Sequence, residues 1–369
     1  MPLTEFELMN PNFYAVILAG GVGSRFWPAS TQAHPKQFHD ILGTGSTLIQ
    51  QTYQRIAHIC PPENILISTS EEYIDEVKQQ LPDIPENNIM AEPARRNTAP
   101  AIAYAVYKIY AKNPNASVLI CPSDHLILKE SEFHRIATLG LTLSQTNNVL
   151  FTLGIKPTRP DTGYGYIQYL PGPSLHPETR KVKTFTEKPN LELAKMFLES
   201  GDFLWNAGIF IWSVQSCRRA FEMYLPEIHQ TFERGLPLFN TDQEKAYIQK
   251  VYPSCENQSV DYGIMEKADN VHVIPADFGW SDLGTWGSLY EHLKWDEHGN
   301  AKVGTHILSF DSRSNIIRIE GDKVAVIDGL ENYIIVDTPH ALLICRRENE
   351  QLIKNFVNEV KIRAGERFV

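Results

Sequence analysis

Residues 14–28 read Tyr-Ala-Val-Ile-Leu-Ala-Gly-Gly-Val-Gly-Ser-Arg-Phe-Trp-Pro. The first six residues form a short apolar run, which predicts a buried strand. Three glycines follow within four positions, so backbone N–H groups can face a ligand and a phosphate chain can approach without meeting a Cβ. We therefore expect a phosphate-binding loop with Arg25 as a cation inside it; the alternative is a tight strand-to-helix turn.

Two familiar phosphate loops do not match this stretch. A dinucleotide-binding GxGxxG motif that starts at Gly21 needs a third glycine where Phe26 stands. A Walker A loop ends in Gly-Lys-Ser/Thr, and no such tripeptide follows. The lysine comes later, as Lys36 in the run His-Pro-Lys-Gln-Phe. The loop is therefore expected to be of another kind.

Strand and helix patterns alternate through the first 150 residues. Strands are predicted at 14–19, 64–69, 117–121 and 149–153, and helices at 46–56, 70–81 and 99–112. This alternation indicates an α/β fold with a mostly parallel central sheet and helices on both faces. Ligands bind beyond the carboxyl ends of the strands in such sheets, so the loops after Ala19 and Cys121 are the expected places for chemistry.

After about residue 150 the regular alternation of strand and helix patterns ends. The middle, to about residue 295, is irregular but adds predicted strands such as 208–212. Five short β segments then follow at 306–310, 315–319, 323–327, 333–337 and 341–345, without a strict repeat period. A helix is predicted to close the chain at about 348–360. We therefore predict two domains, residues 1–296 and residues 297–369.

Composition and charge exclude several classes of function. The 369 residues carry 34 Lys and Arg against 44 Asp and Glu, a formal net charge of −10, with no basic block. Such a chain is a poor binder of nucleic acid or of an anionic membrane surface. A mean hydropathy of −0.26 and the lack of an apolar run of ~18 residues predict no membrane span.

The expected location is the cytoplasm. Residues 1–10 lack the basic segment with which a signal peptide begins. The five cysteines are scattered, which predicts reduced thiols rather than a disulfide framework or a zinc site.

Two acidic residues stand where a metal ion could be held. Asp124 comes soon after the strand predicted at 117–121, and Asp282 lies in the run Gly-Trp-Ser-Asp-Leu-Gly-Thr-Trp at 279–286. Mg²⁺ takes one or two protein carboxylates and fills its octahedron with water and phosphate oxygens. Each acid alone could equally be a helix cap or a turn residue, and the sequence does not show that the two are close.

The glycine loop with Pro35-Lys36 resembles the signature of sugar-1-phosphate nucleotidyltransferases. A fuller set of motifs resembles the mannose-1-phosphate guanylyltransferases, also called GDP-mannose pyrophosphorylases. These motifs are PKQF at 35–38, RNTAP at 96–100, PSDH at 122–125, FTEKP at 185–189, WNAG at 205–208 and GWSDLGTW at 279–286. They follow the family's order and span most of the chain.

The resemblance implies a Rossmann-like nucleotidyltransferase domain and a specific reaction. GTP and α-D-mannose 1-phosphate would give GDP-mannose and pyrophosphate, by in-line attack of the sugar phosphate on the α-phosphorus. That nucleophile is already an anion, so catalysis needs positioning and charge neutralisation rather than a general base. The implied partners are these two substrates, with no nucleic acid and no membrane, and the implied cofactor is Mg²⁺.

The resemblance also implies roles for single residues. The catalytic residues would be Arg25, Lys36, Asp124 and Asp282, with Lys36 at the α-phosphate and the two aspartates on Mg²⁺. The nucleotide would be bound by Leu18, Ala19, Gly20, Gly21, Gly23, Ser24, Arg25, Asn97, Thr98 and Asp124. The sugar phosphate would be bound by Gly165, Glu187, Lys188, Asn206, Gly208 and Asp261. The alternative is that Glu187 and Lys188 form only a charged turn before the next helix.

Further expectations concern the end of the chain. The β segments resemble the family's small left-handed β-helix, which implies contacts in a homodimer. Only about 70 residues follow the first predicted domain, so the isomerase domain of longer family members is expected to be absent.

Two other functions stay open. The chain could be a transferase of the same fold for another base or sugar 1-phosphate, because the residues from Glu92 to Arg96 depart from the family pattern. It could also be a non-catalytic homologue that senses nucleotide sugars, which would have little need to keep Arg25, Lys36, Asp124 and Asp282.

Overall fold

The computed structural model describes residues 9–369, and these form two compact units. The first unit consists of the chain up to Gly20, Thr52–Ser123 and Ile127–Trp280; the second consists of Gly21–Gln51, Asp124–Leu126 and Ser281–Val369. The expectation that no signal peptide is present concerns residues 1–10, most of which lie outside the described part. None of the helices within residues 9–369 has the length and apolar character to span a bilayer. The domain boundary at 296/297 stays a prediction.

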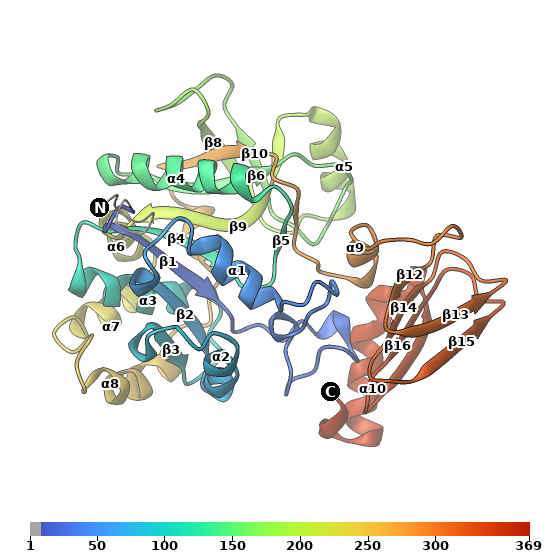
Figure 1. Cartoon of the computed structure of the whole chain (residues 1–369). Helices are drawn as coiled ribbons and strands as arrows, with labels where there is room; N and C mark the ends of the chain where they lie inside the picture. Colours follow the sequence, from blue (N-terminus) through green and yellow to red (C-terminus); the bar gives the residue numbers. More distant parts are fainter. Residues whose placement is uncertain (1–8) are drawn as a thin grey trace, which may run out of the picture. The chain divides into compact units, whose positions relative to one another are not determined.

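A nine-stranded sheet forms the centre of the first unit (Figure 1). Its strands are β1 (Phe13–Leu18), β2 (Ile65–Ser70), β3 (Ile89–Glu92), β4 (Ser117–Pro122), β6 (Leu150–Ile155), β7 (Tyr166–Tyr169), β8 (Arg180–Thr186), β9 (Phe203–Ser213) and β10 (Val271–Ala276). Their order is β3-β2-β1-β4-β9-β6-β10-β8-β7. β1 runs parallel to β2 and β4, whereas β9 is antiparallel to β4 and β6. The predicted α/β fold is confirmed, but its sheet is mixed rather than mostly parallel. The pairings along β3-β2-β1-β4 and between β6 and β10 are parallel, whereas β9, β8 and β7 pair with their neighbours in antiparallel fashion.

Helices cover both faces of this sheet (Figure 1). The helices are α2 (Ile74–Gln80), α3 (Thr98–Lys112), α4 (Glu130–Thr146), α5 (Leu191–Ser200), α6 (Val214–Tyr224), α7 (Pro226–Arg234) and α8 (Glu244–Val251). Phe210 and Trp212 of β9 belong to the hydrophobic cluster that contains α3. Ile211, between them, faces α4, where a Cβ added at Gly140 would lie 2.7 Å from its Cδ1. Successive residues of a strand point to opposite faces, so β9 holds both helical layers.

Three short elements lie where the two units meet in sequence. They are α1 (Leu48–Ile56), β5 (Leu126–Ile127) and β11 (Trp280–Ser281).

The second unit contains a β-helix-like domain. Its strands are β12 (Ala301–Val303), β13 (His306–Phe310), β14 (Ile316–Ile319), β15 (Val324–Asp328), β16 (Tyr333–Asp337) and β17 (Leu342–Arg346). β12, β14 and β16 stack in parallel, as do β13 and β15, and the antiparallel β17 ends the stack. The predicted β-helix-like domain is confirmed, and its left-handedness stays a prediction.

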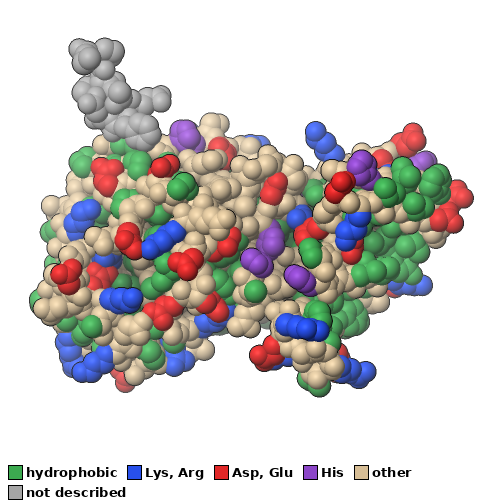
Figure 2. Space-filling view, turned by 60° about the horizontal axis from the view of Figure 1, so that its bottom comes forward, with side chains coloured by type: hydrophobic (Ala, Val, Ile, Leu, Met, Phe, Trp, Pro, Cys, Tyr) green, Lys and Arg blue, Asp and Glu red, His purple; other side chains and the backbone are tan. Residues whose placement is uncertain are grey.

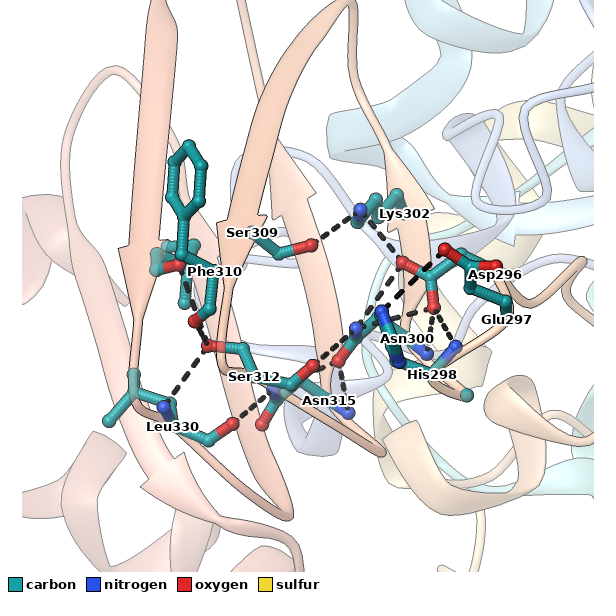
Figure 3. Close-up of polar contacts among 12 residues, drawn as sticks. Asp296, Glu297, His298, Asn300, Lys302, Ser309, Phe310, Ser312, Asn315 and Leu330 are labelled. Atoms are coloured by element: carbon teal, nitrogen blue, oxygen red, sulfur yellow. Dashed lines mark hydrogen bonds and ion pairs between the residues drawn. The ribbon is translucent and has the colours of Figure 1, made fainter.

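Two buried asparagines connect successive turns of this domain (Figure 3). Asn300 Oδ1 accepts hydrogen bonds from the backbone N–H and the side-chain amide of Asn315. Asn315 Nδ2 also donates to the carbonyl of Leu330, and its Oδ1 accepts from the N–H of Tyr333. These side chains satisfy backbone groups at the bends, where no strand partner is available.

Two helices complete the second unit, α9 (Trp286–Tyr290) and α10 (Ile353–Ala364). A hydrophobic cluster joins Phe26 and Leu48 to Leu283, Trp286 and Ile353. The glycine-rich loop, the start of α1, and the segment around Asp282 therefore share one core with the C-terminal helix.

Candidate functional site

The glycine-rich loop folds tightly against Lys36 in the second unit. Gly23 has φ +69°, and a Cβ added there would lie 2.6 Å from the Cβ of Lys36, so a side chain at this position would force the loop away. The N–H of Lys36 donates to the carbonyl of Val22 at 3.3 Å. The loop then continues as a 3₁₀ turn over Ser24–Phe26, and Gly21 is exposed.

The ammonium group of Lys36 is buried among oxygen atoms. The side chain of Lys36 is only 4% exposed, and its Nζ lies 2.7 Å from Asp124 Oδ2. Nζ also donates to the carbonyls of Asp282 at 2.8 Å and Leu283 at 3.1 Å. The ring of Phe26 lies beneath, with its centroid 5.5 Å from Nζ. A buried charge requires such partners, because desolvation without them costs several kcal/mol.

The two aspartates take different positions around this ammonium group. Burial alone would raise the pKa of Asp124, but the charge and hydrogen bond of Lys36, together with the charge of His125 and a backbone hydrogen bond, lower that pKa below its usual value. Asp282 contributes its carbonyl to Lys36, while its Oδ1 accepts the N–H of Gly284 at 2.9 Å within a tight turn. Lys36, Asp124 and the Asp282 turn are therefore brought together.

The guanidinium group of Arg25 contains a buried N–H group that has no hydrogen-bond acceptor among the described residues. This group is the Nε–H. Buried N–H groups without partners are rare, and many are satisfied by a ligand when one is present. Arg25 stands on the glycine-rich loop, so an anion bound at the loop would supply the missing acceptor.

The oxygen atoms around Lys36 fit a hard cation. The ammonium of Lys36, itself a cation, contacts the carboxylate of Asp124 and the carbonyls of Asp282 and Leu283, and the carboxylate of Asp282 belongs to the adjoining turn. Within residues 9–369, no group of three or more His, Cys, Asp or Glu side chains is placed to hold a metal ion. A Mg²⁺ ion needs only one or two carboxylates when substrate phosphates complete its shell, so the residues present fit that ion.

The start of the loop belongs to the first unit and is fixed by its backbone. The carbonyls of Leu18 and Ala19 accept hydrogen bonds from Ser123 N and Thr69 Oγ1. Gly20 follows, and a Cβ added there would lie 3.7 Å from Glu92 Oε1. The loop thus leaves β1 from a rigid position at the carboxyl end of the sheet.

Asn97 and Thr98 begin helix α3. The Asn97 side chain caps the helix by accepting the N–H of Thr98 at 2.9 Å, with the backbone at φ +65°. The hydroxyl of Thr98 accepts the N–H of Val260, which ties the start of α3 to the segment before Asp261.

The predicted sugar-phosphate residues gather in the first unit. Asn206, on β9, donates to Asp261 Oδ1 at 2.9 Å, and its own Oδ1 accepts from the N–H of Gly208. The N–H of Asn206 donates to the carbonyl of Gly165 at 2.8 Å. A Cβ at Gly165 would meet Glu187 Oε2, so a side chain at this position would displace the carboxylate from where it lies.

Charge is concentrated in this cluster. Glu187 is 9% exposed at its side chain and pairs with Lys188 Nζ at 2.8 Å. Burial would lower the pKa of Lys188, but its pairing with Glu187 gives a net increase. Burial and the charge of Glu187 raise the pKa of Asp261 to about 7. Asp261 opens a π-helical turn, Asp261–Met265, a rare conformation that is frequent at functional sites.

Sequence reasoning missed a buried carboxyl group beside the start of the loop. Glu92 ends β3 and accepts hydrogen bonds from Ser68 Oγ and Tyr252 OH, both at 2.7 Å. The two hydrogen bonds lower the pKa of Glu92, but burial has the larger effect and raises it. A carboxylate has about four acceptor positions, so Glu92 can accept further donors from a ligand. Glu92 could have been chosen as a candidate from the sequence, because it ends a strand and lies in the segment that departs from the family pattern.

A second missed residue supports Asn206. The hydroxyl of Thr152 on β6 donates to Asn206 Oδ1 at 3.0 Å and holds the orientation of its amide. Nothing in the local sequence indicates this contact, because it joins two different strands.

Two protein-family models match this chain. One, described as nucleotidyl transferase, covers residues 14–298. The other, described as MannoseP isomerase/GMP-like beta-helix domain, covers residues 304–360.

Curated relatives and a solved structure resemble most of the chain. The mannose-1-phosphate guanylyltransferase of Escherichia coli is 34% identical over 96% of this chain and 77% of its own length. The mannose-1-phosphate guanylyltransferase RfbM of Salmonella typhimurium is 35% identical over 95% of this chain and 73% of its own. A crystal structure described as mannose-1-phosphate geranyltransferase from Thermus thermophilus matches with a TM-score of 0.84 and 27% identity, covering 95% of this chain and 99% of that one.

The raised pKa of Asp261 predicts how stability depends on pH. A carboxyl whose pKa rises from 3.8 to about 7 on folding stabilises the fold while it is protonated, and this contribution is lost as the pH rises through 7. We expect the free energy of unfolding to fall between about pH 4 and about pH 8 relative to that of Asp261→Asn. Urea titrations across this range measure the difference. Asp269→Asn, which removes an exposed carboxyl of the same unit, is the control. A constant difference between the chain and Asp261→Asn would contradict the assignment.

Proposed function

This chain belongs to the mannose-1-phosphate guanylyltransferase branch of the nucleotidyl transferase family, and we propose that it transfers GMP from GTP to α-D-mannose 1-phosphate, giving GDP-mannose and pyrophosphate. The observation that carries the proposal is the buried ammonium of Lys36. It is held by Asp124 and two carbonyls directly behind a glycine-rich loop whose Arg25 has an unsatisfied N–H. The ammonium of Lys36, held in a fixed position, and the N–H of Arg25, which has no acceptor, are suited to binding the phosphates of a nucleotide.

The proposed chemistry needs charge neutralisation more than proton transfer. The sugar phosphate attacks the α-phosphorus as an anion, and pyrophosphate leaves in line. Arg25 and the N–H groups of the loop hold the β- and γ-phosphates. Lys36 meets the α-phosphate, where negative charge grows in the transition state, so its attraction is strongest there.

Asp124 and Asp282 are proposed to hold Mg²⁺. When bound, that ion supplies positive charge to the phosphate oxygens and keeps the two reacting groups in register. Asp124 is paired with Lys36, so one carboxylate would serve both the ammonium and the ion. Lys36 would then contact a substrate phosphate in place of the carboxylate that holds the ion.

The cluster of the first unit is proposed to bind the sugar phosphate. Lys188 supplies a cation for the phosphate, and Glu187 and Asn206 accept and donate hydrogen bonds to sugar hydroxyls. Asp261, with a pKa of about 7, presents either a donor or an acceptor near neutral pH. Gly165 and Gly208 have no side chain, so the backbone on either side of Asn206 can lie close to the ligand.

Glu92 is proposed to select the base. Guanine presents two adjacent N–H donors, N1–H and the 2-amino group, and a carboxylate accepts both. Ser68 and Tyr252 hold the Glu92 carboxylate from within the protein. Asn97 and Thr98 are the proposed neighbours of the base or ribose.

A homodimer through the β-helix-like domain is also proposed. Four large apolar side chains stand on the outer face of β13 and β15: Leu308, Phe310, Val324 and Val326, each between 51% and 65% exposed. Figure 2 shows hydrophobic side chains gathered at the right of the view, on the side where Figure 1 draws these strands. Contiguous apolar patches of this kind mark interaction sites, and a second copy would bury the same face in a symmetric contact.

Pyrophosphate release over a matrix of nucleoside triphosphates and sugar 1-phosphates, with and without Mg²⁺, tests the proposed reaction. We expect GTP with mannose 1-phosphate to be the fastest pair and to depend on Mg²⁺. A faster reaction with another pair would favour the alternative transferase of the same fold. Release with no pair would contradict the enzyme and favour the nucleotide-sugar sensor.

The assignment of Glu92 predicts a change of base preference in Glu92→Gln. Inosine lacks the 2-amino group, so the native chain should prefer GTP to ITP by about 10-fold to 100-fold in kcat/KM, the value of a hydrogen bond to a charged acceptor. A glutamine side chain presents one oxygen acceptor and one NH₂ group, and that NH₂ group cannot accept from the N–H donors of guanine. The preference for GTP over ITP should therefore fall to about threefold or less. Glu256→Gln, an exposed position of the same unit, is the control. An unchanged GTP-to-ITP ratio in Glu92→Gln would remove Glu92 from base selection.

Sedimentation velocity tests the homodimer. We expect a dimer at micromolar concentration, and a monomer for Val326→Glu, because a buried charge without a partner opposes association. Ile362→Glu changes another exposed apolar residue, on α10, and should remain a dimer. A monomeric native chain, or a dimer unaffected by Val326→Glu, would argue against this face.

A further inference from the structure

The residue after the 3₁₀ turn of the glycine-rich loop is attached to the C-terminal end of the chain. Trp27 is 6% exposed, and its Nε1 donates to the carbonyl of Phe368 at 2.6 Å. Nearby, the N–H of Gln32 donates to the carbonyl of Val369 at 3.2 Å. Two hydrogen bonds therefore join the segment that carries Arg25 to the last residues, which lie more than 330 positions later in sequence.

The local conformation of the C-terminal segment makes these bonds possible. Helix α10 ends at Ala364, and Gly365, with φ +105°, turns the chain out of the helix. A 3₁₀ turn, Glu366–Phe368, then returns the backbone to the loop. Above it, Phe356, Val357 and Val360 of α10 pack against the cluster that contains Trp27.

The support behind the loop is not continuous. A surface pocket of about 290 Å³ is lined by residues of the loop and of α10, which include Val22, Ser24, Trp27, Val357 and Lys361. Because this pocket is partly open to solvent, the loop is not held against α10 by close packing along its whole length. The hydrogen bond of Trp27 lies at the edge of the pocket and limits the movement that the pocket would otherwise allow.

We propose that Trp27 is a positioning residue, which uses its bond to Phe368 to hold the glycine-rich loop in the conformation that binds nucleotide phosphates. The C-terminal helix α10 then sets the nucleotide affinity without touching the nucleotide. This inference rests on the proposed function for its substrate, and it adds a role for residues 366–369 that is separate from dimer contacts.

The test compares Trp27→Phe with the native chain. Phenylalanine keeps an aromatic ring but lacks the N–H, so the loop should become more mobile while the fold remains. We expect faster backbone hydrogen exchange in residues 22–27 and a GTP KM raised about fivefold to tenfold, which corresponds to one lost hydrogen bond. The KM for mannose 1-phosphate and kcat should change by less than about twofold. A chain that ends at Gly365 removes the acceptor carbonyls and should reproduce these changes.

Trp295→Phe is the matched control. Trp295 belongs to the same unit and also donates its indole N–H to a backbone carbonyl, that of Tyr290 at 2.8 Å, but it is 55% exposed and makes no contribution to the loop. It should leave hydrogen exchange at residues 22–27 and the GTP KM unchanged.

Three results would overturn the proposal. The first is unchanged exchange in residues 22–27 in both Trp27→Phe and the shortened chain. The second is an equal increase in the KM of both substrates, which would indicate a general loss of structure. The third is faster exchange with an unchanged GTP KM. If the native chain shows no transfer at all, the proposed function fails, while the exchange measurement still decides whether Trp27 holds the loop.

Discussion

The second unit depends on one buried ammonium group, that of Lys36. Its charge is withdrawn from water, so it must be met by a carboxylate and by hydrogen-bond acceptors, which Asp124 and the carbonyls of Asp282 and Leu283 supply. Loss of one partner from a buried ion pair costs about 3–5 kcal/mol, because the other charge stays buried. Lys36 therefore fixes three segments that are far apart in sequence: the glycine-rich loop, the residues after β4, and the turn at Asp282.

The same pairing explains how an acidic chain can act on phosphates. The net charge of −10 opposes long-range attraction of anions, so the positive charge must be local. Lys36 is paired with Asp124, and Lys188 with Glu187. Each carboxylate holds its cation in a fixed position and partly neutralises its charge. In the proposed function, a substrate phosphate would meet a cation that is already in place, which limits the reorganisation that binding requires.

Features that depend on neighbouring residues could be predicted from the sequence, and features that depend on distant contacts could not. The apolar run before Gly20 predicted β1, because burial and periodicity are local signals. The run at 208–212 predicted a strand, but periodicity does not encode its antiparallel position between β4 and β6. Within the candidate site, the resemblance singled out Lys36 and Asp124, whereas Glu92 was missed because one of its partners, Tyr252, lies 160 residues away. The hydrogen bond from Trp27 to Phe368 joins residues 341 positions apart, so no pattern in the sequence around either residue indicates it.

The role of Lys36 is tested most directly by the steady-state kinetics of Lys36→Met with GTP, mannose 1-phosphate and Mg²⁺. Thermal unfolding of the same sample establishes that the variant is folded. If the proposed interaction of Lys36 with the α-phosphate is strongest in the transition state, kcat should fall about 100-fold or more, with a GTP KM within about threefold of the native value. A kcat close to the native value, with the loss confined to KM, would contradict a role for Lys36 in the transition state.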